Sequence, residues 1–409
     1  MMHRSAFLLV AAIISLDVSA APSTPTFKFY GVNEAAANFG TELPGQYGVD
    51  YTWPNPDSIK NFTGQGFNTI RIGIQMERLT PDGLTAKFDQ DYLGNLTSTV
   101  DLVTSQGAYA LIDPHNYGRF YNEIINSTAD FGTWWTNVAS LFKENELVMF
   151  DVNNEFWGMN TSHVFAMNQA AINAIRAAGA TSQYITPEGN QWTSAWGWTN
   201  IPGQDGVTNG QVMGDLVDPS NKLVYQMHHY LNSDGSGNDD SCVSATVGSD
   251  RLKATTTWLR DNKKVAFIGE FAGGVNDVCV SAVKDMLNYM NSNSDVWLGF
   301  TWWAAGPWWG PTHYNSIEPG EGIAYDTYVP ILRSAANGEI FAPPPPSSTT
   351  TTDVSSSSST SPPTASPTLW GKCGGVGWDG PTNCPGGSCC VPQNQWYWQC
   401  VLDCPTTTA

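Results

Sequence analysis

Eight short apolar runs, rich in β-branched and aromatic residues, recur at intervals of roughly 30 to 45 residues. They read FKFYGVN, NTIRIGI, AYALID, LVMFDV, QYITPE, KLVYQMH, VAFIGE and VWLGFTWW. Several intervals contain stretches with helical spacing of apolar residues, such as residues 169–180 and 283–290. Eight strand-and-helix units predict an α/β fold, a (β/α)8 TIM barrel, with functional groups at the carboxyl ends of its strands. An open doubly wound sheet is the alternative, but no glycine-rich phosphate loop follows the first run.

The composition changes abruptly after Ala342. Residues 343–367 are dominated by Pro, Ser and Thr, which cannot form a packed core, so we expect an extended, O-glycosylated linker. The predicted barrel occupies residues 22–342, and residues 368–404 form a small second domain that holds six of the eight cysteines. A domain of about forty residues is near the size at which disulfides become necessary, so these cysteines are structural.

The chain begins with MMHRSAFLLVAAIISLDVSA, which combines a basic start, a short apolar run and small residues before Ala21. This pattern predicts a signal peptide over residues 1–20, and therefore a secreted, extracellular protein. No later segment has the length and hydropathy of a membrane span, so we expect no membrane association. N-glycosylation sequons fit an extracellular location; they begin at Asn61, Asn95, Asn126 and Asn160.

The cysteines divide between the two domains. Eight cysteines allow 105 pairings, whereas six confined beyond the linker allow 15 pairings among themselves. The two cysteines of the large domain remain for each other, so we expect a Cys242–Cys279 disulfide.

Charge and aromatic content narrow the class of partner. The formal net charge is −19, from 18 Lys and Arg against 37 Asp and Glu. Binding to nucleic acid needs clustered basic residues, so we expect no nucleic-acid partner and a neutral substrate instead. The 17 tryptophans either offer flat faces to an uncharged ligand or fill the core.

Polar, ionisable or aromatic residues lie at or just beyond the ends of seven of the eight runs. They are Arg71, Asp113, His115, Asn154, Glu155, Glu188, His228, Tyr230, Glu270, Trp302 and Trp303. A single Glu after a strand is more often the first carboxylate of a helix than a catalyst. So many polar groups at one rim would cost stability without a function, and together they favour an active site.

This set of residues suits the hydrolysis of a glycosidic bond. One carboxyl group must protonate the leaving oxygen and another must face the anomeric carbon; Glu155 and Glu270 follow the fourth and seventh runs. A separation of roughly 5 to 5.5 Å would indicate retention of configuration, and roughly 6.5 to 9.5 Å would indicate inversion. We expect Arg71 to lower the pKa of Glu270. Phe156, Trp157 and the charge of Glu270 should raise the pKa of Glu155.

A metal site is the competing interpretation for Asp113, His115 and His228. No HxH or HExxH spacing is present, so we expect neither a metal nor an organic cofactor. Strand alternation sends the rings of His228 and His229 in opposite directions, so one faces the site. Glu188 and Glu34 are interpreted as hydrogen-bond partners rather than proton donors.

Many motifs of the large domain occur in the order of a known family. They include GVNEAAANFG, NTIRIGI, DPHNYGR, NNE, EGNQWTSAWGW, MHHYLNSDGSG, FIGEFAGG and WWAAGPWW. Across residues 27–342 the chain resembles the secreted fungal endoglucanases of glycoside hydrolase family five. The resemblance implies a retaining β-1,4-glucanase on a (β/α)8 barrel.

The same resemblance implies a role for each matching residue. Glu155 would be the acid/base and Glu270 the nucleophile. Asn154 would bind the 2-hydroxyl of the sugar at the cleavage point, and Arg71 would keep the nucleophile ionised. Trp303 would be the stacking platform for the sugar before the cleaved bond. The remaining polar ring would consist of His115, His228 and Tyr230.

The chain departs from the family immediately after Glu155. These enzymes often carry Pro or Tyr and then His-Asp at this point, whereas this chain has Phe156, Trp157 and Gly158. Any hydrogen bond that the His and Asp would make near Glu155 is therefore missing. The aromatic pair either removes water from Glu155, builds a sugar subsite or packs the start of a helix, and the sequence leaves these alternatives open.

The tail, WGKCGGVGWDGPTNCPGGSCCVPQNQWYWQC, resembles the fungal cellulose-binding module of family one. Its cellulose-binding residues would be Trp370, Trp396 and Tyr397, with Asn394 and Gln399 as hydrogen-bond partners. Strand alternation alone would instead place Trp396 and Trp398 on one face. The resemblance implies the disulfides Cys373–Cys390 and Cys384–Cys400, which leaves Cys389 and Cys404 for each other. Because Cys389 and Cys390 are adjacent, their assignments exchange easily.

These features together predict a secreted, monomeric endo-β-1,4-glucanase that hydrolyses internal bonds of cellulose and soluble β-1,4-glucans with retention. One alternative is an endo-β-1,4-mannanase on the same fold. Another is a non-catalytic cellulose-loosening protein.

Overall fold

The computed structural model describes residues 27–342, 372–374, 382–384, 386, 388–392 and 398–401. The chain divides into two compact units, Met1–Pro345 and Pro346–Ala409. The expected signal peptide (1–20) and linker (343–367) lie outside the described residues. Several expected functional or disulfide residues of the tail lie outside them as well: Trp370, Asn394, Trp396, Tyr397 and Cys404.

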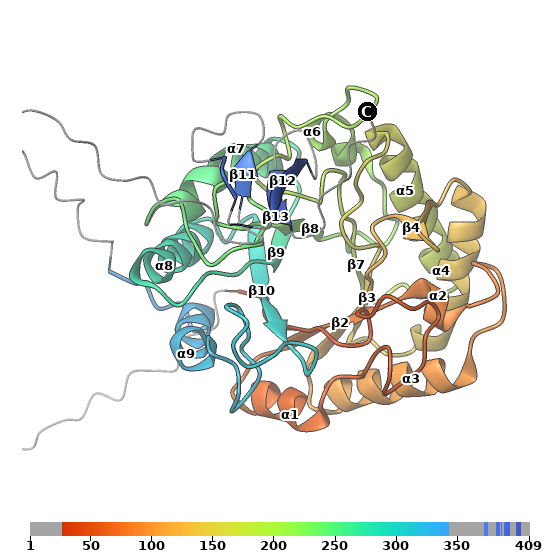
Figure 1. The fold of residues 1–409 in the computed structure, drawn as a ribbon. Coiled ribbons are helices and arrows are strands. Elements are labelled where there is room, and N and C mark those ends of the chain that lie inside the picture. Colours follow the sequence, from red (N-terminus) through yellow and green to blue (C-terminus); the bar gives the residue numbers. More distant parts are fainter. Residues whose placement is uncertain are drawn as a thin grey trace, which may run out of the picture. The chain divides into compact units, whose positions relative to one another are not determined.

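The large unit is a barrel of eight parallel strands with helices around its outside (Figure 1). Its strands are β1 (Phe29–Glu34), β2 (Thr69–Ile74), β3 (Tyr109–Pro114), β6 (Val148–Asp151), β7 (Tyr184–Thr186), β8 (Tyr225–His228), β9 (Ala266–Glu270) and β10 (Trp297–Ala305). Their order in the sheet is β7-β6-β3-β2-β1-β10-β9-β8. Single bridges, Ile185 with Leu223 and Glu188 with Gln226, join β7 to the β8 side and close the ring. The predicted (β/α)8 fold is confirmed, and each strand lies within one of the apolar runs or overlaps it.

Helices follow the strands as the periodicity predicts. They are α1 (Pro56–Gly64), α2 (Met76–Leu79), α3 (Gln90–Ser105), α4 (Thr128–Phe142), α5 (Thr161–Ala177), α6 (Asn209–Val212), α7 (Val247–Asp261), α8 (Asp277–Ser292) and α9 (Tyr325–Ala336), with a 3-10 turn at Met213–Asp215. A small hairpin, β4 (Arg119–Phe120) and β5 (Glu123–Ile124), precedes α4. Side chains that accept a backbone N–H fix several helix starts: Asp89 caps α3, Ser127 caps α4 and Asn276 caps α8.

Two apolar cores lie on the two faces of the curved sheet. The smaller core consists of Phe29, Leu111, Met149, Val224 and Phe267. The Phe29 ring lies 5.2 Å from the rings of Tyr109 and Tyr184, which belong to strands that are not neighbours of β1. This core therefore fills the barrel interior. The alternate strand residues, such as Ile112, join the larger cluster between the sheet and the helices.

The tail contains a three-stranded antiparallel sheet of β11 (Lys372–Gly374), β13 (Trp398–Val401) and β12 (Cys389–Pro392). It contains the expected Cys373–Cys390 disulfide. Cys384 and Cys389 are also disulfide-bonded, but the described side chains do not include Cys400, so the other two pairs stay predictions. Trp398 is 40% exposed and a Cβ at Gly374 would lie 2.8 Å from its ring.

No described helix, in either unit, is both long enough and apolar enough to span a bilayer. In the barrel, the expected Cys242–Cys279 disulfide is present and joins the loop after β8 to the start of α8.

Candidate active site

A buried arginine on β2 is the centre of the candidate site. Arg71 donates through Nη1 to Glu270 Oε1 (2.6 Å) and through Nε to Asp151 Oδ2 (3.0 Å). Its Nη2 lies 3.1 Å from Asp113 Oδ2 and 3.3 Å from Glu188 Oε1. Carboxylates at the ends of four different strands therefore share one guanidinium charge.

The alternation of side chains along the strands explains why these groups meet. Asp113, Asp151 and Gln226 each lie two residues after a member of the interior core, so they face the barrel axis above it. Gln226 donates to Asp151 Oδ2 (2.5 Å) and to Glu188. A Cβ at Gly269 would lie 2.5 Å from the Gln226 Cδ, so this glycine leaves room for the amide. Asp151 and Gln226 are not among the residues predicted from the sequence, although the period of two marks both as inward-facing.

Glu270, the last residue of β9, is held by a donor at each oxygen. Oε1 accepts from Arg71, and Oε2 accepts from the Tyr230 hydroxyl at 2.8 Å. Glu270 is only 3% exposed, so its carboxylate is almost completely removed from water. Its orientation is thus fixed by two partners, Arg71 within β2 and Tyr230 just after β8.

Glu155 follows β6 in a turn rather than in a helix. Helix α5 begins only at Thr161, so Glu155 is neither its N-cap nor part of its first turn. The backbone of Glu155 has φ 48°, in the left-handed region, and its N–H donates to Glu188 Oε2 at 2.6 Å. Its Oε1 lies 2.6 Å from His228 Nδ1. The carboxyl group is therefore aimed into the barrel mouth by the turn and fixed by the histidine.

The two glutamates lie close together. An oxygen of Glu155, an oxygen of Glu270 and a ring nitrogen of His228 all lie within 4.8 Å of one another. A metal ion can bridge such a spacing, but Arg71 already pairs with Glu270, and its positive charge would repel a cation. The donor set therefore suits proton transfer between buried carboxyl groups better than metal ligation.

Burial and neighbouring charge give the two carboxyl groups different pKa values. Burial, together with the negative charge of Glu270, raises the pKa of Glu155 well above its usual range. Burial also raises the pKa of Glu270, but Arg71, His115 and the Tyr230 hydroxyl oppose that rise. Arg71 lowers the pKa of Glu270 as expected, but burial outweighs an arginine that is shared by four carboxylates, so the pKa of Glu270 is raised overall. Glu155 therefore has the more strongly raised pKa and is the more suitable proton donor of the two.

Asn154, His115 and Trp303 line the mouth beside this pair. Asn154 accepts from Arg71 Nη2 (2.7 Å), and its Nδ2 lies 3.3 Å from His115 Nε2. His115 Nδ1 lies 2.7 Å from Asp113 Oδ2, and burial lowers the pKa of His115 to about 4, so its ring is neutral above that pH. The Trp303 ring stacks on His115 at 5.3 Å with planes 12° apart. The expected residues are thus brought together in one network.

The histidine pair at the end of β8 points two ways, as alternation predicts. His228 faces Glu155, whereas Nε2 of His229 donates to the Gly248 carbonyl at 3.1 Å, away from the site. Glu188 and Glu34 have protein partners, as expected: Glu188 accepts from Glu155 N, and Glu34 accepts from the Ser58 hydroxyl at 2.7 Å.

The two aromatic residues after Glu155 have different environments. Phe156 is completely buried and belongs to the core outside the barrel. Trp157 is 38% exposed, stacks on Trp192 at 5.5 Å with planes 8° apart, and lies under the Arg119 guanidinium. Phe156 therefore excludes water by packing, and Trp157 forms part of an exposed aromatic surface on the rim. Trp196 and Trp308 are also exposed.

Two carboxyl groups facing each other at the carboxyl ends of barrel strands define the class of protein: this is the arrangement of a glycoside hydrolase. The family model described as Cellulase (glycosyl hydrolase family 5) matches residues 28–306. The chain therefore belongs to glycoside hydrolase family 5. A second model, the fungal cellulose binding domain, matches residues 369–397.

Named relatives and solved structures agree with this membership. The chain is 51% identical over 339 residues to a probable endo-beta-1,4-glucanase B of Aspergillus kawachii. This match covers 82% of this chain and 99% of that protein. It is 51% identical over 313 residues to Endoglucanase 3 of Humicola insolens, covering 76% and 78%. The barrel is similar to XacCel5A solved with cellopentaose (TM-score 0.72, 35% identity, 76% and 99% covered). It is also similar to Cel5A (EG2) of Hypocrea jecorina (TM-score 0.63, 29% identity, 71% and 93% covered).

Proposed function

We propose that the protein is a secreted endo-β-1,4-glucanase that hydrolyses internal bonds of cellulose and soluble β-1,4-glucans with retention of configuration. The observation that carries this proposal is the spacing of Glu155 and Glu270, whose nearest oxygens lie within 4.8 Å. Inverting enzymes need roughly 6.5 to 9.5 Å between the carboxyl groups to admit a water, so the short spacing supports double displacement. The glucanase names of the relatives support the substrate class.

In the first step, Glu270 attacks the anomeric carbon as the nucleophile. Glu155 donates its proton to the glycosidic oxygen, the bond from the anomeric carbon to that oxygen breaks, and the leaving sugar departs as an alcohol. Arg71 and Tyr230 hold the two oxygens of Glu270 in one orientation before the substrate arrives. The product of this step is a glycosyl ester on Glu270.

In the second step, Glu155 acts as a base. The ester of Glu270 carries no negative charge, so the pKa of Glu155 falls and its carboxylate accepts a proton from water. The water oxygen bonds to the anomeric carbon, and the bond to Glu270 breaks. His228, 2.6 Å from Glu155 Oε1, keeps the carboxyl group in place through both steps.

The remaining residues of the network bind the sugar. The Asn154 amide donates to the 2-hydroxyl at the cleavage point, and Trp303 is the platform on which the sugar stacks. His115 supports that platform from behind, because the two rings are stacked. A neutral substrate suits a mouth in which Arg71 is already occupied by carboxylates.

The tail serves as a cellulose-binding module in this proposal. Its rings Trp370, Trp396 and Tyr397 would stack on the polymer, with Asn394 and Gln399 as hydrogen-bond partners. The linker, residues 343–367, keeps the barrel (22–342) at high local concentration over an insoluble substrate. Removal of a signal peptide, residues 1–20, would place the protein outside the cell, where we propose that it acts as a monomer without a cofactor.

Rates of reducing-sugar release from carboxymethylcellulose and from β-mannan test the proposal. We expect release from the glucan to be at least about tenfold faster. The reverse ratio would assign an endo-β-1,4-mannanase. Adsorption to cellulose without sugar release from either polymer, at any acidic pH, would assign the non-catalytic cellulose-loosening protein instead.

A further inference from the structure

Residues 231–246, here called the 231–246 loop, connect Tyr230 to helix α7 and lie beside the nucleophile. Tyr230 is the residue whose hydroxyl donates to Glu270 Oε2 at 2.8 Å. The Arg251 guanidinium donates to the backbone oxygens of Tyr230 and Asn232 at 3.1 and 2.8 Å. The backbone around Tyr230 is therefore fixed, and the direction of its ring depends on what packs against it.

Gly237 packs directly against that ring. A Cβ at Gly237 would lie 2.6 Å from Cε1 of Tyr230, a distance that side chains do not tolerate. Gly237 also has φ 70°, in the left-handed region that glycine adopts without strain. The absence of a side chain at this position thus lets the loop backbone lie flat on the aromatic ring.

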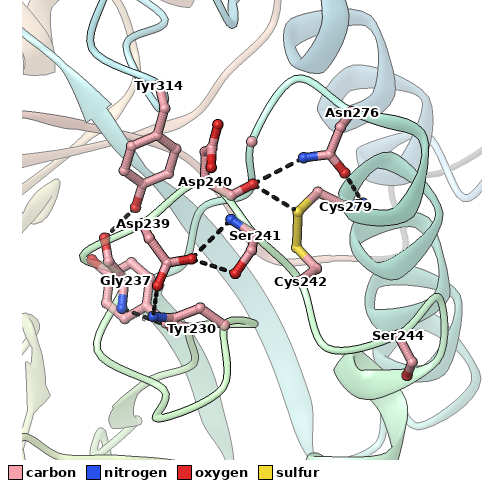
Figure 2. Close-up of a disulfide and its surroundings, with 12 residues drawn as sticks. Tyr230, Gly237, Asp239, Asp240, Ser241, Cys242, Ser244, Asn276, Cys279 and Tyr314 are labelled. Atoms are coloured by element: carbon pink, nitrogen blue, oxygen red, sulfur yellow. Dashed lines mark hydrogen bonds between the residues drawn. A yellow bond between two sulfur atoms is a disulfide. The ribbon is translucent and has the colours of Figure 1, made fainter. Parts of the chain in front are cut away.

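Contacts from several segments keep Gly237 in this position (Figure 2). The Tyr314 hydroxyl, from the loop after β10, donates to the Gly237 carbonyl, and Gly237 N donates to Asn232 Oδ1 at 3.0 Å. Further along, the Asp240 carbonyl accepts from Asn276 Nδ2 at 2.9 Å. The Cys242–Cys279 disulfide then ties the end of the segment to α8. The 231–246 loop is therefore held by the loop after β10 at Gly237 and by the loop after β9 at Asp240.

We propose that Gly237 and Tyr314 are positioning residues for catalysis: together they press the 231–246 loop on Tyr230 and so direct its hydroxyl to the nucleophile Glu270. The Tyr314 hydroxyl donates to the Gly237 carbonyl and not to Glu270, and Gly237 lies against the Tyr230 ring, so both residues act through that ring. The inference rests on the proposed function of Glu270. It adds the disulfide-bonded 231–246 loop to the groups that orient this nucleophile.

The pH dependence of kcat/KM on a soluble β-1,4-glucan tests this inference. Its acidic limb follows ionisation of the nucleophile, and a hydroxyl that donates to a carboxylate favours the ionised form. Gly237→Ala should displace the ring and move the acidic limb to higher pH by about one unit, which is about a tenfold loss of activity below it. Tyr314→Phe keeps the ring and removes one hydrogen bond, so it should move the limb the same way by less.

Gly235→Ala is the matched control. Gly235 lies in the same loop with φ 73°, but its Cβ would meet Trp196 at an ordinary 3.5 Å and not Tyr230. We expect its acidic limb to stay where the wild-type limb lies. In a Tyr230→Phe background, Gly237→Ala should add almost nothing, because both changes remove the same hydrogen bond.

Three outcomes would overturn the inference: an unmoved acidic limb in both Gly237→Ala and Tyr314→Phe, an equal shift in Gly235→Ala, or full additivity with Tyr230→Phe. If Gly237→Ala does not fold, Tyr314→Phe alone decides the matter. A wild-type enzyme that released no sugar from any glucan would refute the proposed function itself. The two failures are therefore distinguishable.

Discussion

Arg71 Nη1 lies 2.6 Å from Oε1 of Glu270. The same guanidinium also forms ion pairs with three other buried carboxylates, those of Asp113, Asp151 and Glu188. Its charge offsets part of the burial of each group and cannot fully ionise all of them. Burial raises the pKa of Glu270 above its usual value, and an arginine shared in this way only partly opposes that rise. The site is consequently a network with one cation, and its members respond to one another.

Removal of the Arg71 charge should therefore affect folding as well as activity. Arg71→Met leaves four buried carboxylates without their cation, and we expect it to lower the free energy of unfolding by about 3 to 5 kcal/mol or to prevent folding. Denaturation in urea, followed by circular dichroism, measures this change. Arg176→Met is the control, because Arg176 pairs with one carboxylate, that of Asp218, and donates to the Ala180 carbonyl, away from the mouth. Equal losses of stability in both variants would contradict the shared-charge account.

Asp113 provides a second prediction, on the pH dependence of stability. Burial raises its pKa to about 7, so the folded protein binds its proton more tightly than the unfolded chain does. The stability contributed by that proton is complete below about pH 4 and is lost as the pH rises to about 7.

Unfolding of the wild type and of Asp113→Asn across this range measures the contribution. Their difference in unfolding free energy should fall by up to about 1.4 kcal/mol per pH unit. Comparison with the variant is needed because His115, with a pKa lowered to about 4, gives stability that changes in the opposite direction. A difference that increased with pH would show that Asp113 is ionised in the folded protein at low pH.

Azide should distinguish the roles of the two glutamates. Loss of a general acid typically slows a reaction by about 10² to 10⁴-fold, but an activated leaving group needs no proton. We expect Glu155→Ala to retain activity on activated aryl glycosides and to give a β-glycosyl azide. Glu270→Ala should give the α-azide or no product. Glu34→Gln, a control at the end of β1, should leave the product unchanged, and the opposite azide pattern would exchange the two roles.

Truncation of Phe156 and truncation of Trp157 should have very different effects on stability. Phe156→Ala removes a fully buried ring, so we expect a loss of about 3 to 5 kcal/mol in stability. Trp157→Ala removes a ring that is 38% exposed, and it should cost less stability while it changes affinity for longer glucan oligomers. Thermal unfolding and oligomer product profiles measure both effects. Equal destabilisation would refute the assignment of separate environments.

Deletion of the residues after Ala342 should separate adsorption from hydrolysis. The barrel is a compact unit by itself, so we expect unchanged rates on soluble glucan and weaker adsorption to crystalline cellulose. Depletion of protein from the supernatant over cellulose measures adsorption. A variant with Trp398→Ala in the full chain tests the alternative binding face. Equal adsorption with and without the tail would rule out a binding role for it.

The barrel was predictable from the sequence because its signal repeats. Each of the eight apolar runs contributes a strand, and a parallel strand buried on both faces is nearly all apolar. The residues at the strand ends were predictable for the same reason: Arg71, His228 and Glu270 lie within or at the ends of those strands.

The partners within the site were harder to predict. Asp151 appeared to be one polar residue inside an apolar run, and only the closed barrel brings it within 3.0 Å of Arg71. The turn at Glu155 depends on Glu188, 33 residues further along the chain, which accepts its backbone N–H. A pattern that looks only at neighbouring positions contains no information about such contacts.

The left-handed backbone of Glu155 has a consequence for how the enzyme can be improved. At φ 48° a glycine or asparagine would have less backbone strain than a glutamate. Selection for thermal resistance alone would therefore replace Glu155, the proposed acid/base residue. The enzyme therefore keeps a locally unfavourable conformation at the residue that we propose as its acid/base. Engineering for heat tolerance should leave this turn unchanged and seek its gains on the outer helices.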